Sequence, residues 1–157
     1  MNTFQILHGD ATEQLRTLPD NSVHCVVTSP PYWGLRDYGH AGQIGLEQTP
    51  DEYVGRLVEV FREVRRVLRD DGTCWLNLGD SYASDTKSAG ASMKSTLATR
   101  PTAYKTTVLR ESGSWKVAHG LKQKDLVGIP WRVAFALQAD GWWLRQDIIW
   151  HKPNPMP

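Results

Sequence analysis

Long apolar runs and cysteines are both scarce in this sequence, and each shortage excludes a class of protein. No run of 18 apolar residues occurs, and Met1 to Asp10 lacks the basic and apolar regions of a signal peptide. The two cysteines, Cys25 and Cys74, form no Cys-x-x-Cys motif and no cluster with histidine, which argues against a zinc site. Both lie in apolar runs and are expected to be reduced core residues. The 157 residues therefore predict one cytoplasmic domain with neither a metal nor a membrane partner.

The net charge is only +1, but the charges are unevenly distributed. Eight of the eighteen basic residues lie between Lys87 and Lys124, where Glu111 is the single acidic residue. This basic segment is rich in Ser, Thr and Gly, and it predicts a flexible insert at about 83–123. Two interpretations stay open and are compatible: a solvated loop, or a contact with nucleic-acid phosphates. The candidate phosphate contacts are Lys94, Lys105 and Lys116.

Strand-like and helix-like patterns alternate along the chain. A 3.6-residue period predicts two long helices, Asp51 to Leu68 and Lys124 to Asp140, and a brief helix is expected at Ala11 to Leu18. The predicted strands are Phe4 to Leu7, Val23 to Thr28, Thr73 to Leu78 and Trp142 to His151. This alternation indicates an α/β fold with a mostly parallel sheet. Functional loops are then expected at the carboxyl ends of the strands, where Asp10, Ser29 and Asp80 fall.

The most informative motif is Ser29-Pro30-Pro31-Tyr32, which follows the second predicted strand and is called the lip below. Both prolines lack an N–H and hold φ near about −65°, so the carbonyls of Ser29 and Pro30 have little freedom. The Ser29 hydroxyl and the Pro30 carbonyl offer two acceptors to the N–H bonds of a flat aromatic amine, and Tyr32 offers a stacking face. The alternative is a Pro-Pro turn that merely closes a strand.

The lip, its strand and the following Trp33-Gly34-Leu35-Arg36-Asp37-Tyr38 resemble the catalytic motif of the site-specific DNA amino-methyltransferases. Three more stretches are similar to that family: Leu46 to Tyr82, Lys124 to Arg132 and Ile148 to Pro157. Their order resembles the circularly permuted (beta) arrangement, in which the catalytic motif precedes the cofactor motif. The resemblance implies a Rossmann-like fold, S-adenosylmethionine as methyl donor, and double-stranded DNA as substrate in a bacterial, archaeal or phage system. It also implies catalytic roles for Ser29, Pro30, Pro31 and Tyr32.

A cofactor motif of that family is absent from these residues. The family binds S-adenosylmethionine through a Phe-x-Gly-x-Gly loop, yet none of the 13 glycines here forms a Gly-x-Gly. In the family's strand order 3-2-1-4-5-7-6, this chain would supply strands 3, 4, 5 and 6 and would lack 1, 2 and 7. We therefore expect the N-terminal catalytic half of an incomplete, permuted fold with an exposed strand edge. The expected partner is a C-terminal methyltransferase half or a second copy of the chain.

Several chemistries remain open at this stage. Serine at position 29 resembles the N4-cytosine enzymes, with N6-adenine methylation as the alternative. Methylation of protein glutamine is disfavoured, because that family has Asn before the prolines and lacks a tryptophan-rich tail. Carbon-5 cytosine chemistry is excluded, because neither cysteine follows a proline. An inactive DNA-binding or regulatory fragment is the non-enzymatic alternative.

Single residues carry weaker expectations. Asp10, with Ala11 beside it, resembles the family's contact to the cofactor adenine, and the alternative is the N-cap of the first helix. Asp80 either caps a turn or lines the site. Trp33 and Arg36 are candidate DNA contacts, with an ion pair to Asp37 as the alternative for Arg36. Three tryptophans are expected in the core: Trp142, Trp143 and Trp150.

Overall fold

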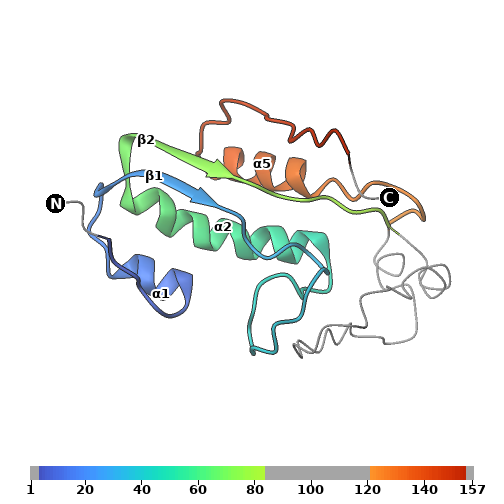
Figure 1. Cartoon of the computed structure of the whole chain (residues 1–157), viewed down its shortest axis with the longest axis horizontal. Helices are drawn as coiled ribbons and strands as arrows, with labels where there is room; N and C mark the ends of the chain where they lie inside the picture. Colours follow the sequence, from blue (N-terminus) through green and yellow to red (C-terminus); the bar gives the residue numbers. More distant parts are fainter. Residues whose placement is uncertain (1–3, 84–120, 155–157) are drawn as a thin grey trace.

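The computed structural model describes residues 4–83 and 121–154, and these form an α/β structure. The elements in chain order are α1 (Ala11–Arg16), β1 (Val23–Thr28), α2 (Pro50–Val67), β2 (Leu68–Leu76) and α5 (Ile129–Ala139) (Figure 1). No helix in this described part of the chain is long and apolar enough to cross a membrane. Three residues of the basic segment that were named as DNA contacts lie outside the described residues: Lys94, Lys105 and Lys116.

β1 and β2 form a two-stranded parallel sheet, and α2 is the crossover between them. The regular register pairs Cys25 with Thr73 and Thr28 with Leu76. Val23 pairs with Leu68, so the intervening residues 69–72 bulge out of the ladder. The strand predicted to begin at Thr73 is confirmed for residues 73–76, which pair regularly with β1. The bulged residues before Thr73 also belong to β2, so the strand follows α2 directly.

α2 supplies most of the core. It begins with a capping box, in which Thr49 and Glu52 bond each other's backbone N–H groups. One face of the helix is buried together with one face of α5. The core residues of the two helices are Tyr53, Val54, Leu57, Phe61, Val64, Ile129, Val133 and Leu137. Partly buried Val26, Cys74 and Leu76 of the sheet pack against this cluster.

α5 begins five residues later than predicted. Gly128 has a φ of 77°, and the Asp80 carboxylate accepts the N–H groups of Gly128 and Ile129. Upstream, the Ala83 N–H donates to the Asp125 carbonyl (2.8 Å) and the Val127 N–H to the Ser81 carbonyl (2.9 Å). The residues that flank 84–120 are therefore paired with each other, and they cannot extend the helix.

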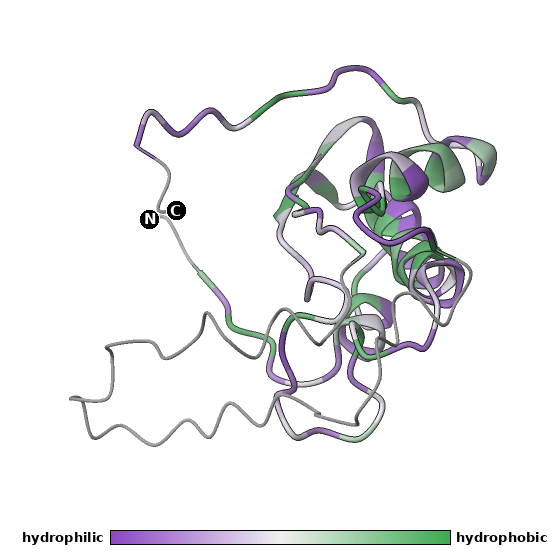
Figure 2. Cartoon of the chain, turned by 90° about the vertical axis from the view of Figure 1, so that its right-hand side faces the viewer, coloured by the Kyte–Doolittle hydropathy of each residue, from purple (hydrophilic) through white to green (hydrophobic). Residues whose placement is uncertain are grey.

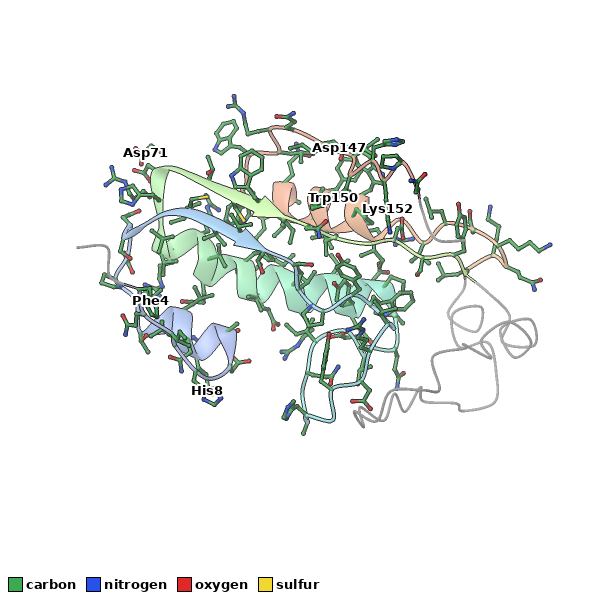
Figure 3. The ribbon with its side chains drawn as sticks, in the orientation of Figure 1. Phe4, His8, Asp71, Asp147, Trp150 and Lys152 are labelled. Atoms are coloured by element: carbon green, nitrogen blue, oxygen red, sulfur yellow. The ribbon has the colours of Figure 1, made fainter. Side chains whose placement is uncertain are left out.

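Two of the four predicted strands are wrong: neither residues 4–7 nor residues 142–151 form a strand. In the expected order, strands 4 and 5 are neighbours, and these are the two that pair as β1 and β2. Strand 3 would need strand 2, and strand 6 would need strand 7, neither of which these residues supply. Phe4 and Trp150 lie on opposite sides of α2 (Figure 3), and the segment after α5 runs apart from the helices (Figure 2).

The sheet is covered on one face only. Val27 is 78% exposed and Trp75 is 50% exposed, and exposed Cys25 lies on the same face, because alternate residues share a face. Cys25 was expected in the core, so that expectation is wrong. Cys74, on the other face, is half-buried, and burial raises the pKa of its thiol to about 11. Trp143 and Trp150 were also expected in the core, but they are 85% and 84% exposed.

This uncovered face predicts association of the purified 157-residue chain. Val27→Lys places a charge on the open apolar face and should weaken self-association roughly tenfold, the effect of losing about one buried valine. Sedimentation velocity across a concentration series measures it. The matched control is Gln138→Lys, which adds the same charge at an exposed position of α5. A wild-type chain that stays monomeric at high concentration would contradict the prediction, because the exposed sheet face would then not drive self-association.

Candidate functional site

The lip lies where both strands end. It leaves the carboxyl end of β1, and one further ladder bond, from the Asn77 N–H to the Thr28 carbonyl (2.9 Å), carries the chain past β2 at the same edge. The residues that follow β2 are therefore neighbours of the lip, as expected for parallel strands.

Two donors converge on the Tyr32 hydroxyl. Ser29 Oγ and Asn77 Nδ2 each donate to it at 3.2 Å, one from the lip itself and one from the end of β2. The ring also lies against Gly79, where an added Cβ would be 2.8 Å from Tyr32 Cε2. The ring is thus fixed at its hydroxyl and along one edge, and Gly79 is the residue that makes room for it.

The lip is anchored to the core through Tyr53. The Tyr53 hydroxyl donates to the Pro31 carbonyl at 2.8 Å, and the Tyr53 side chain is fully buried. Burial raises the pKa of Tyr53 far above its ordinary value, and the Glu47 carboxylate and Tyr32 raise it further. The raised pKa keeps the hydroxyl protonated, and therefore a donor, at neutral pH.

Trp33 lies in the core, which corrects its assignment as a DNA contact. The side chain is 3% exposed, and its Nε1–H donates to the Glu47 carbonyl at 3.0 Å. Its large apolar area packs with α2 and α5, so little of the ring is left exposed for a base or a phosphate. The tryptophan after the lip therefore serves packing.

A hollow of about 300 Å³ opens beside the lip. Its lining combines the lip with three residues of the following loop, and consists of Ser29, Pro30, Pro31, Tyr32, Leu35, Arg36 and Tyr38. Arg36 is the only cationic side chain in that lining, and no ion pair between Arg36 and Asp37 occurs in the described part of the chain. The four proposed catalytic residues and Arg36 are thus brought together at one opening.

Asp10 and Asp80 both have structural roles. The Asp10 carboxylate accepts the N–H groups of Thr12 and Glu13 (2.9 and 3.1 Å), so it is the N-cap of α1. Residues 4–7 are not a strand, and α1 lies beneath the half of α2 remote from the lip (Figure 1), so Asp10 does not join Ser29 at a common sheet edge. Asp80 caps α5, and it also lines a smaller hollow on the other side of Tyr32.

Sequence reasoning missed Asn77, Tyr53 and Tyr38 as parts of this site. Tyr53, Asn77 and Gly79 belong to the stretch Leu46 to Tyr82, which was recognised only as a whole. The described residues contain no cluster of three or more His, Cys, Asp or Glu side chains that could hold a metal ion.

Comparison with known proteins gives a consistent result. Residues 23–157 match the family model described as DNA methylase, whose name covers N6 and N4 methyltransferases. The Type II methyltransferase M.Cfr9I of Citrobacter freundii is 51% identical, over 100% of this chain and 49% of its own length. M.XycI of Xanthomonas campestris pv. cyanopsidis is 55% identical, over 97% of this chain and 47% of its own length. M.SmaI of Serratia marcescens is 49% identical, over 100% of this chain and 50% of its own length.

The chain spans about half the length of these curated relatives. The matched family region begins at the first residue of β1 and includes the lip, its anchor Tyr53 and the hollow beside it. The chain thus belongs to the DNA methylase family, as the N-terminal part of a DNA amino-methyltransferase.

Proposed function

We propose that the intact enzyme that contains this chain transfers a methyl group from S-adenosylmethionine to the exocyclic amine of a flipped base in double-stranded DNA, with N4 of cytosine as the target. The observation that carries the proposal is the fixed lip, in which Tyr53 holds Pro31 and two donors hold the Tyr32 hydroxyl. The names of the relatives favour a place in a restriction–modification system in the cytoplasm.

The lip suits an amine that is a weak nucleophile. The lone pair of an exocyclic base nitrogen is delocalised into the ring, and acceptors at its N–H bonds favour a localised lone pair. Since Ser29 Oγ donates its own proton to Tyr32, its lone pairs are left to accept from the amine. The Pro30 carbonyl is the second proposed acceptor, and a site fixed before the substrate arrives needs little reorganisation.

The methyl donor fits the described residues poorly. S-adenosylmethionine would supply an electrophilic methyl group, but the chain has no Gly-x-Gly, and the Asp10 carboxylate is engaged in capping α1. Asp10 and Ala11 remain proposed contacts to the adenine part of the donor. We propose that most of the donor site comes from residues outside this chain, in a C-terminal methyltransferase half or a second copy that also covers the open sheet face.

DNA contacts are proposed at two places. Arg36, at the mouth of the hollow, can meet a phosphate next to the flipped base. The basic segment would add contacts from Lys94, Lys105 and Lys116, each of which contributes about one unit to the salt dependence of binding. The residues on either side of 84–120 pair with each other, Ala83 with Asp125 and Ser81 with Val127.

Replacing Tyr32 tests the site directly. In the intact enzyme, Tyr32→Ala should lose a base stack of about 1–3 kcal/mol and most of the methylation rate, whereas Tyr32→Phe keeps the stacking ring. Single-turnover transfer of labelled methyl groups measures this. Tyr82→Ala, at an exposed tyrosine that lines neither hollow, is the control. Methylation by Tyr32→Ala at the parent rate would remove the lip from the catalytic site.

The product follows from the residue at position 29. Ser29 in the lip resembles the N4-cytosine enzymes, so DNA treated with the intact enzyme should yield N4-methylcytosine. Mass spectrometry of the released nucleosides identifies the modified base. N6-methyladenine as the sole product would reverse the assignment to cytosine and leave the amine chemistry of the lip in place.

A further inference from the structure

The lip forms one wall of the hollow, and in the second wall the proposed chemistry uses only Arg36. The loop 34–45, called the pocket loop below, supplies Leu35, Arg36 and Tyr38 to the lining. Leu35 is 59% exposed and Tyr38 is 54% exposed. Two large side chains thus present apolar surface at an opening whose other side is Tyr32.

The pocket loop is held by its own hydrogen bonds. The side-chain amide of Gln43 donates to the Arg36 carbonyl (2.9 Å) and accepts the Tyr38 N–H (2.7 Å), so it bridges the two residues of the wall. The Gly34 N–H donates to the Gly45 carbonyl at 2.7 Å and closes the base of the loop. Gly39 and Gly42 have φ of 75° and 78°, a conformation that other residues adopt only with strain. These three hydrogen bonds and two glycines define the shape of the loop.

The pairing of this wall with the lip suits one class of ligand. A flipped nucleobase is flat and apolar on both faces, and pockets for flipped bases enclose it between aromatic or apolar side chains. A hollow of about 300 Å³ lies at the lower end of the range for small-molecule sites, a size in keeping with a single base. Ser29 and Pro30 lie at the edge of the same hollow, where the amine of such a base would reach them.

We propose that the pocket loop is the second wall of the target-base pocket, with Tyr38 as a stacking residue for the flipped base and Gln43 as the residue that positions it. The inference rests on the proposed function, because it names the occupant of the same site. Arg36 has a different part: its guanidinium binds the DNA backbone, and it does not touch the base. Base binding and backbone binding are therefore separable by mutation.

Two duplexes separate these parts in the intact enzyme. One carries the sequence that the enzyme methylates, and the other is identical but has an abasic position in place of the target base. Tyr38→Ala should weaken binding of the first duplex roughly tenfold relative to the second, as expected for the loss of one base–aromatic stack. Tyr38→Phe should keep the wild-type ratio. Arg36→Ala should weaken both duplexes equally and reduce the salt slope by about one unit.

Gln43 is tested by coupling to Tyr38. Gln43→Ala should change the binding ratio in the same direction as Tyr38→Ala, and the double variant should lose no more than Tyr38→Ala alone, because Gln43 acts through Tyr38. Gln138→Ala, at an exposed glutamine of α5, is the matched control. A Tyr38→Ala variant that keeps the wild-type ratio, or additive losses in the double variant, would overturn the inference. If Tyr32→Ala is also fully active, the proposed function fails as well; if Tyr32→Ala is inactive, only the second wall fails.

Discussion

The lip depends on one buried hydrogen bond, from the Tyr53 hydroxyl to the Pro31 carbonyl. Tyr53 is the first buried side chain of α2 after Pro50, so the bond joins the end of β1 to the beginning of the helix that leads to β2. An unpaired carbonyl in this place would cost about 1–3 kcal/mol, which the bond avoids. The raised pKa of Tyr53, caused mainly by burial, keeps this donor protonated at neutral pH. The lip is thereby attached to the most buried part of the molecule.

From that anchor the site is built outward in layers. Tyr32 lies against Gly79, and its hydroxyl accepts hydrogen bonds from Ser29 and Asn77. The pocket loop lines the same hollow and is held by hydrogen bonds within the loop, such as the one from Gln43 to the Arg36 carbonyl. Both layers lie at the carboxyl edge of β1 and β2, on the side opposite the bulge at residues 69–72. What these residues do not supply is a second covered face of the sheet or a glycine-rich cofactor loop, and the relatives are about twice as long. These residues thus hold the lip and the hollow at one end of an open sheet.

Local signals predicted local structure well. The period of the apolar residues predicted α2 to within one residue at each end, and it also predicted the buried face. The failures involve distant partners. Residues 4–7 and 142–151 have strand-like patterns but no neighbouring strand, and a strand forms only as part of a ladder. The start of α5 is set by Asp80, which lies 48 residues before Gly128 in the chain. Trp33 is buried by packing in the folded protein, and the residues next to it in the sequence do not predict this burial. In the site, the lip was predicted from its chemistry, whereas the hydrogen bond from Asn77 to Tyr32 joins residues 45 positions apart and follows only from the fold.

The central claim is that this chain holds the amine site, while the methyl donor needs residues beyond it. Calorimetric titration of S-adenosylmethionine into the purified 157-residue chain tests it, first alone and then with the C-terminal half of a relative such as M.Cfr9I added in trans. We predict no measurable binding by the chain alone, and binding together with DNA methylation in the mixture. Micromolar binding by the chain alone would contradict it, because a complete donor site would then exist within these residues.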